Sequence, residues 1–135
     1  MKQSFLLICV LSLLTACNGT AKKATQEAAV QPVNLILDTD LGPDYDDVGA
    51  MAVMHALADS GYVNILATLS SNHDELVIPC IEVLNIYFNR PDIPLGAPKS
   101  EGGVTMTSGH KIKWTEILPA KYPHKTKKTS DAPDA

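Results

Sequence analysis

A run of acidic residues in the first half of the chain has the side chains best suited to chemistry. Five carboxylates fall within ten positions of this 135-residue sequence, in the stretch Asp38-Thr39-Asp40-Leu41-Gly42-Pro43-Asp44-Tyr45-Asp46-Asp47. Like charges this close raise one another's pKa and destabilise a compact fold unless a positive charge lies among them. Carboxylate oxygens are the ligands that hard divalent cations such as Ca²⁺ prefer. The run therefore predicts a metal site.

Helix capping is the alternative interpretation of the same residues. Asp44 could cap a helix, and Asp46 and Asp47 would then favour its positive N-terminal end, each by about 0.3 to 1 kcal/mol. Capping does not explain Asp38 and Asp40, which precede the helix and would place charge at the end of a buried strand without a partner. The burial cost of those two acids favours the metal site.

The elements on either side of the acidic run are apolar. The sequence predicts a buried strand at Val33–Leu37 and a helix at Asp46–Ser60 that is apolar on most faces and therefore covered on more than one side. Tyr62–Leu69 has the composition of a second strand. A strand, a helix and a strand in this order predict parallel pairing through a right-handed crossover.

The alternation continues beyond the second strand. Glu75–Asn89 predicts a second helix, which should begin nearer Val77 because Pro79 is tolerated only in a first turn. Ile93–Gly96 predicts a brief third strand, and only Trp114–Leu118 suggests a helical turn after it. The expected fold is α/β, an open and mostly parallel sheet with flanking helices.

Two polar turns are expected at one edge of this sheet. The acidic run follows the first strand, and Ser70–Asp74 follows the second. Ligands of open α/β sheets bind beyond the carboxyl ends of the strands. The order of elements therefore places both turns where a ligand would bind.

The N-terminus resembles a bacterial lipoprotein signal. A basic residue precedes the apolar stretch Phe5–Leu14, and the segment Leu14-Thr15-Ala16-Cys17 ends it. The stretch is too short to span a bilayer. We expect a signal at residues 1–17, a lipid on Cys17, a tether at residues 18–31 and a domain at residues 32–135. Such a protein is exported and held at the periplasmic or cell-surface face of a membrane, with an uncleaved signal anchor as the alternative.

Cysteine count and charge narrow the classes of function. Once Cys9 is removed and Cys17 is acylated, Cys80 is left without a disulfide partner, and its apolar neighbours predict a small buried residue. The net charge is −4 and the only arginine is Arg90. A scarcity of Arg without interleaved aromatic residues argues against nucleic-acid binding. The lysines late in the chain are expected to lie in a solvated loop.

The acidic run also resembles a known family. Asp38-Thr39-Asp40, Gly42 and Asp46-Asp47 before an Ala-rich helix resemble the N-terminal signature of the nucleoside hydrolases of the inosine-uridine-preferring type. Asn72, near the end of the second strand, and the stretch Asn89–Leu95 resemble that family as well. The resemblance covers roughly residues 34 to 96.

The resemblance implies calcium-dependent hydrolysis of the N-glycosidic bond of a ribonucleoside to ribose and a free base, a reaction of purine and pyrimidine salvage. It implies that Asp40 and Asp47 hold Ca²⁺ and that Asp40 is the general base for a calcium-bound water. Asp46 and Asn72 would hydrogen-bond the ribose hydroxyls. Asp38 would orient Asp40.

The same resemblance implies a longer protein, because that family takes its other calcium ligands and its leaving-group acid from a C-terminal half. They include a His followed by Asp, and no such pair follows Gly96. We therefore expect the N-terminal part of a truncated nucleoside hydrolase-like domain. Whether the full-length protein forms a homo-oligomer, and which base it prefers, stay open.

Two alternatives to the nucleoside hydrolase remain. One is a non-catalytic, truncated lipoprotein fragment. The other is a haloacid-dehalogenase-like phosphohydrolase, which Asp38-Thr39-Asp40 also resembles, with Asp38 as nucleophile and Asp40 as general acid. That family has Thr or Val where this chain has Gly42, and it leaves Asp46 and Asp47 without a role.

Overall fold

The structure is a computed structural model that describes residues 31–42, 44–99, 102–106 and 113–135. Strands and helices alternate along this part of the chain. The elements are β1 (Val33–Thr39), α2 (Asp46–Asp59), β2 (Val63–Ser70), α3 (Val77–Tyr87), β3 (Leu95–Gly96), α4 (Trp114–Lys121) and a 3₁₀ turn, η1 (Thr129–Asp131).

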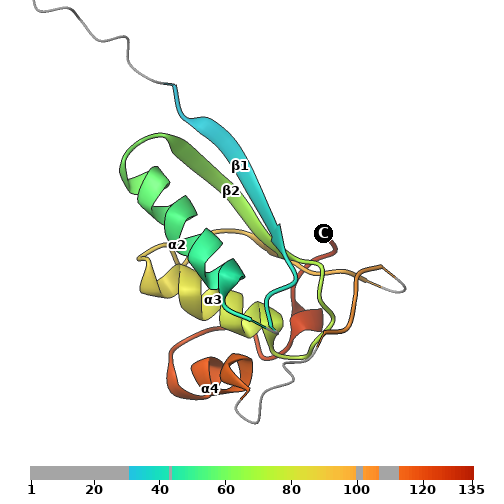
Figure 1. Cartoon of the computed structure of the whole chain (residues 1–135). Coiled ribbons are helices and arrows are strands. Elements are labelled where there is room, and N and C mark those ends of the chain that lie inside the picture. Colours follow the sequence, from blue (N-terminus) through green and yellow to red (C-terminus); the bar gives the residue numbers. More distant parts are fainter. Residues whose placement is uncertain (1–30, 43, 100–101, 107–112) are drawn as a thin grey trace, which may run out of the picture.

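The strands form one parallel sheet in the order β1-β2-β3 (Figure 1). β1 pairs with β2 along its whole length, with one register shift after Leu35, and β3 adds only two residues beside Thr68 and Leu69. The predicted α/β class, with a parallel sheet and flanking helices, is confirmed. The two-residue β3 pairs only with the carboxyl-terminal part of β2, so the sheet is three strands wide at its carboxyl edge and two strands wide elsewhere.

Helices α2 and α3 lie on one side of the sheet, and α4 packs against α3 (Figure 1). Side chains of β1 and β2 that point away from the helices are exposed, including Ile36 at 56% and Leu66 at 43%. The prediction that Val33–Leu37 is a buried strand is therefore wrong, because three of its five side chains are exposed and the other two are half-buried. Within the described ranges, only one face of this part of the sheet is covered.

The two long helices differ from expectation in how they are covered. α2 was predicted to be covered on more than one side, but Val53 is 60% exposed and only Met51, Met54 and His55 are buried. In α3 every residue from Val77 to Asn85 is buried. α3 lies between the sheet on one side and α4 with η1 on the other, whereas α2 contacts chiefly β2.

The core is built around α3. The helix begins at Val77 with Pro79 in its first turn, as predicted. Cys80 is a buried core residue, also as predicted, and burial raises the pKa of its thiol to about 12, so that it carries almost no thiolate at neutral pH. The buried apolar cluster consists of Leu41, Met51, Val77, Ile78, Cys80, Ile81, Leu84, Ala97, Trp114 and Ala132.

The C-terminal segment packs on α3 more closely than a solvated loop would. The Glu82 carboxylate is buried and accepts hydrogen bonds from Lys125 N–H at 3.0 Å and from Thr126 N–H and Oγ1 at 2.9 and 2.7 Å. The lysine side chains of this segment are exposed, but its backbone is bound to α3 through Glu82. The sequence pattern identified the lysines as solvated and missed the buried acid that holds their backbone.

Among the described residues, none of the helices has the length and apolar character that crossing a bilayer requires. The predicted signal, Cys17 and the tether fall outside the described residues.

Candidate metal centre

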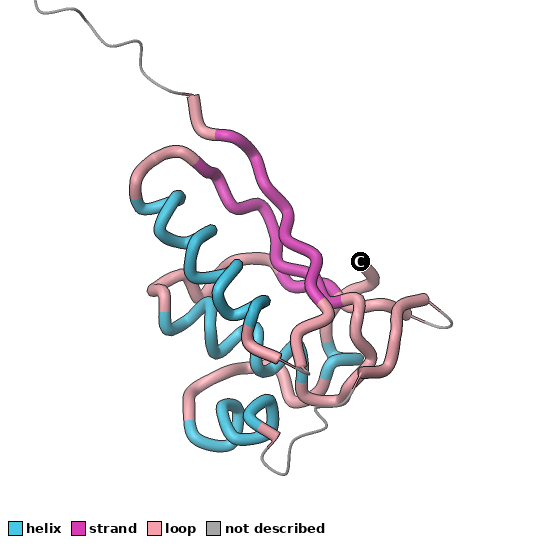
Figure 2. The backbone as a smooth tube through the Cα atoms, in the orientation of Figure 1, coloured by secondary structure: helices cyan, strands magenta, loops and turns pink. Residues whose placement is uncertain are grey.

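The candidate site forms where β1 ends and α2 begins. Leu41 is fully buried and anchors the connecting loop in the core, and its N–H donates to Thr39 Oγ1 at 3.0 Å. The backbone of this loop lies beside the turn after β2, since Ser71 N–H donates to the Thr39 carbonyl at 2.9 Å. Figure 2 shows these loops together at the carboxyl ends of the two strands.

Three of the five acidic side chains gather there, and a fourth lies beside one of them. Carboxylate oxygens of Asp44, Asp46 and Asp47 all lie within 4.8 Å of one another. Asp40 is half-buried and lies close enough to Asp47 to hydrogen-bond its carboxyl group. The predicted ligands Asp40 and Asp47 are therefore neighbours, and the predicted substrate contact Asp46 lies beside them.

Hydrogen bonding, burial and mutual repulsion together shift the pKa values of the cluster. A hydrogen bond to Asp46 raises the pKa of Asp44 above its ordinary value, together with slight burial and the charges of its neighbours, while the same hydrogen bond lowers the pKa of Asp46. Partial burial raises the pKa of Asp47, and the charge of Asp40 adds to this although Thr39 opposes it with a hydrogen bond. Asp44 and Asp47 are thus harder to ionise than isolated carboxyl groups, and a cation bound among them would favour their ionised forms.

Asp46 and Asp47 lie in the first turn of α2, as the capping interpretation expects, but Asp44 does not cap the helix. The residue that caps α2 is Tyr45, and its side chain makes no capping hydrogen bond. Asp44 is bonded to Asp46 rather than to the free N–H groups of the helix. Sequence reasoning gave Asp44 no role beyond capping, although its spacing of two and three residues from Asp46 and Asp47 was a signal that it joins them.

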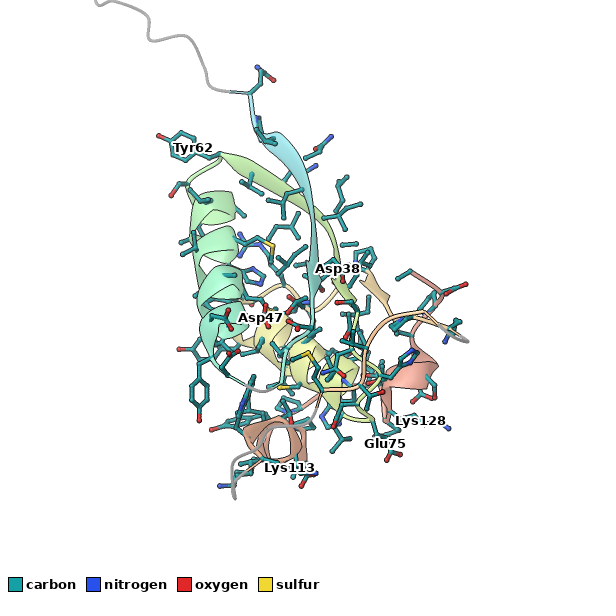
Figure 3. The ribbon with its side chains drawn as sticks, turned by 45° about the vertical axis from the view of Figure 1, so that its right-hand side comes forward. Asp38, Asp47, Tyr62, Glu75, Lys113 and Lys128 are labelled. Carbon is teal, nitrogen blue, oxygen red and sulfur yellow. The ribbon has the colours of Figure 1, made fainter. Side chains whose placement is uncertain are left out.

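Asp38 does not join the cluster. Its side chain is exposed and lines a separate hollow of about 290 Å³ together with Ser71 and Lys99. Figure 3 shows Asp38 on β1 and Asp47 at the beginning of α2. Because alternate residues of a strand point to opposite faces, Asp38 follows Ile36 on the uncovered face. Its role in orienting Asp40 stays a prediction.

Asn72 occupies the centre of this region and is fully buried. Its Nδ2 donates to the carbonyls of Asp40, Leu41 and Met106 at 3.1, 3.3 and 3.0 Å. Its Oδ1 accepts from the N–H groups of Asp74 and Met106 at 2.9 and 3.1 Å. An amide has two N–H donors and one carbonyl with two lone pairs, so its hydrogen-bonding capacity is filled by the protein.

Asn72 therefore joins the acidic loop to the segment around Met106. A Cβ on Gly42 would lie 3.2 Å from the Asn72 Nδ2, so this close approach favours the glycine. The predicted contact between Asn72 and a ribose hydroxyl requires that one of these hydrogen bonds be exchanged. The sequence pattern identified the position as important but not as a link between loops.

An aromatic pair lies beside the acids. The ring of Tyr45, between Asp44 and Asp46 in the sequence, lies 5.5 Å from the ring of Trp114 at α4. Trp114 is the single tryptophan of the chain. Its Nε1 is buried and has no hydrogen-bond partner among the described residues. The pair gives the site an optical reporter of its own.

The histidines after β2 that the structure describes are bound to backbone carbonyls. A ring nitrogen of His73 is hydrogen-bonded to the Gly102 carbonyl, and Nδ1 of His124 to the Tyr122 carbonyl at 2.9 Å. His110 lies outside the described residues. The candidate donor set is thus carboxylate oxygen throughout, which suits Ca²⁺ rather than a softer ion. The four acids supply part of the six to eight oxygens, approximately, that Ca²⁺ takes.

No protein-family model, no curated protein and no solved structure matches this chain. The interpretation of the site therefore depends on its own geometry and on the sequence pattern.

Proposed function

We propose that this chain is the N-terminal part of a calcium-dependent nucleoside hydrolase, which cleaves the N-glycosidic bond of a ribonucleoside to ribose and a free base. The observation that supports it most directly is the convergence of Asp40 with Asp44, Asp46 and Asp47 beyond the carboxyl end of β1. This is the edge at which open α/β sheets bind ligands. The pattern of acids also matches the family resemblance drawn from the sequence.

Asp40 is the general base in this proposal. A water molecule attacks C1′ of the ribose, the C1′–N bond breaks with its electron pair going to the base, and the Asp40 carboxylate accepts a proton from the water. Asp40 suits this role because it is half-buried beside Asp47 and comes directly after the carboxyl end of β1. Ca²⁺ bound by the cluster would lower the pKa of a coordinated water. The proton for the departing base comes from a group that we do not assign in this chain.

Asp46 is the residue we assign to the sugar. Its carboxylate is exposed and its pKa is lowered, by Asp44 and by backbone N–H groups at the start of α2, so it is ionised at neutral pH. An ionised carboxylate accepts hydrogen bonds from hydroxyl groups, and such contacts strengthen as the sugar approaches a cation-like transition state. Asn72 would contribute only after its loop rearranges.

We further propose that a lipid on Cys17 holds the protein at a membrane. The resemblance of residues 14–17 to a lipoprotein signal supports this. The substrate would then be a nucleoside outside the cytoplasm, and the described domain would stand away from the bilayer on the tether at residues 18–31.

The test compares the purified 135-residue chain with the native product of its locus, whose intact mass is measured first. Both are assayed for release of hypoxanthine from inosine and for release of phosphate from a sugar phosphate, with Ca²⁺ or with a chelator. The four acids leave the calcium shell incomplete, so we expect no detectable hydrolysis by the 135-residue chain.

A longer native product that releases hypoxanthine only with Ca²⁺, and loses this activity in Asp40→Asn, would support the proposal. Phosphate release would favour the haloacid-dehalogenase alternative. A native product of 135 residues that does neither would contradict an enzymatic role, and rapid hypoxanthine release by the 135-residue chain would refute the incomplete-shell argument.

A further inference from the structure

A buried polar chain connects α2, α3 and β2 away from the acidic cluster. His55 of α2 is fully buried, and its Nε2 lies 3.2 Å from Oδ1 of Asn85 in α3. The Nδ2 of Asn85 donates in turn to Thr68 Oγ1 of β2 at 2.8 Å. The His55 ring also stacks on Phe88, with centroids 4.5 Å apart. Of the three side chains in this hydrogen-bonded series, His55, Asn85 and Thr68, only that of His55 can gain a proton near neutral pH.

The partners of His55 determine which of its nitrogens carries the proton. Arg90 Nη1 lies 3.4 Å from His55 Nδ1, and a guanidinium can only donate, so Nδ1 is the acceptor. Nε2 then carries the hydrogen that it donates to Asn85. The geometry fits the neutral imidazole, with one nitrogen for each role. A proton added at Nδ1 would turn an accepted hydrogen bond into a contact between two donors.

Of the two charged groups near His55, the cation opposes its protonation and the acid favours it. Arg90, which follows α3, is the charged group that faces its Nδ1, and the nearest acid is Asp59 of α2 itself. Asp59 is already bound to Arg90 Nη2 at 2.5 Å. The neighbours from α3 and β2, namely Asn85, Phe88 and Thr68, carry no charge. A cationic His55 would therefore lie beside a second cation, in a buried place, without a carboxylate of its own.

We infer that His55 is an acid-sensitive latch, which holds α2 to α3 and β2 when neutral and releases them when protonated. The helix it holds also carries Asp46 and Asp47, nine and eight positions earlier, so release would loosen the acidic cluster on its α2 side. The inference rests on the buried contacts of His55 and does not depend on the proposed enzyme activity.

The direction of the pH dependence follows from linkage. Burial lowers the pKa of His55 below the 6.5 of a free imidazole, although the hydrogen bond to Asn85 opposes this. Between the folded and unfolded pKa values the unfolded chain binds more protons, so stability is fully present above pH 6.5 and falls as the pH falls below it. One proton changes the folding equilibrium constant by at most about tenfold per pH unit.

The experiment measures urea unfolding of the full chain from pH 7.5 to 5, through the fluorescence of Trp114. The variants are His55→Gln, whose amide can still donate to Asn85 but does not titrate, and His124→Gln as a matched control on a half-buried histidine outside this polar series. We expect the folding constant of the wild type and of His124→Gln to fall by up to about tenfold per pH unit below pH 6.5, and that of His55→Gln to stay level in this range.

A His55→Gln variant that keeps the wild-type slope, or a wild type without any slope, would overturn the inference. If His55→Gln does not fold, two further measurements on the wild type test the inference. Its imidazole resonances should show one histidine that titrates below the others, and amide exchange in α2 should quicken across that titration while exchange in the middle of α3 does not. Ordinary titration of all the observed histidines would refute the latch.

Discussion

Replacing Asn72 by alanine tests the structural argument most severely, because one side chain holds two loops. The variant Asn72→Ala removes an amide that is fully buried and bonded to four residues, Asp40, Leu41, Asp74 and Met106. The amide has two N–H groups and two lone pairs, so four of the five contacts can be strong at once. The truncation leaves several backbone groups without partners.

The expected loss of stability follows from the backbone groups that the truncation leaves without partners. A net hydrogen bond contributes about 0.5 to 1.5 kcal/mol, and a buried group left without a partner costs about 1 to 3 kcal/mol. Met106 is 36% exposed and Asp40 is half-buried, so water can replace part of the loss there. We therefore expect Asn72→Ala to lower the free energy of unfolding by about 2 to 4 kcal/mol.

The assay is urea unfolding at pH 7, followed through Trp114. The matched control is Asn64→Ala on β2, because the Asn64 amide is exposed and bonds only to the Asn34 side chain, at 2.9 Å, among the described residues. That variant should lose less than about 0.5 kcal/mol. Equal losses in the two variants, or a loss below about 1 kcal/mol in Asn72→Ala, would refute the view that Asn72 joins the loops.

Three further predictions concern the C-terminal segment, a glycine turn and the N-terminus. Glu82→Gln should lose about 1 to 2 kcal/mol at pH 7, because the bonds from Lys125 and Thr126 outweigh burial and hold the pKa of Glu82 below its ordinary value. The stabilising effect of the ionised Glu82 is fully present above pH 4.5 and is lost as the pH falls through the folded pKa. Urea unfolding should therefore show the difference in stability between the variant and the wild type shrinking below pH 4.5. A difference that stays constant would contradict this. Gly103→Ala should lower the free energy of unfolding, measured by thermal unfolding, by at least about 1 kcal/mol more than Gly61→Ala. Both glycines have positive φ, but a Cβ on Gly103 would lie 2.5 Å from the Ser71 carbonyl oxygen, whereas a Cβ on Gly61 meets nothing within 4 Å. Equal losses would count against the described turn. Cys17→Ser should move the protein from the membrane fraction and abolish labelling by a radioactive fatty acid, while Cys9→Ser should change neither; continued labelling of Cys17→Ser would show that the lipid lies elsewhere.

The order of elements could be predicted from the sequence because each has a strong local pattern. The apolar runs around Leu35 and Ile65 and the stop at Gly61 define a parallel unit without any knowledge of its neighbours. Which side chains of these elements become buried could not be predicted in the same way. Ile36 and Val53 are as apolar as buried residues, and only the placement of the other elements leaves them exposed.

The candidate site was likewise predictable in part. Charge density drew attention to all five acids and the family resemblance singled out Asp40, Asp46 and Asp47, which the structure places near one another. Asp38 and Asp40 would share a face of a longer strand, and they separate because β1 ends at Thr39. The sequence pattern does not fix the end of a strand to a single residue. The linking role of Asn72 depends on contacts with Met106, more than thirty positions away, and no local pattern reports such contacts.

Binding of Ca²⁺ to the acidic cluster is the measurement that tests the account most directly. Calorimetric titration of the wild-type chain with CaCl₂ should give one weak site, with a Kd of about 0.1 to 1 mM because the four acids supply only part of a calcium shell. The fluorescence of Trp114 should change along the same curve, since its ring contacts that of Tyr45 within the acidic loop.

The variant Asp47→Asn should weaken this binding by at least about tenfold, because it removes a charged ligand from the cluster. The control Asp92→Asn removes an exposed acid, 3.8 Å from Lys125, and should leave the Kd unchanged. No binding up to about 10 mM Ca²⁺, a concentration well above the weak range, or equal effects of the two variants would contradict a calcium site at the end of β1.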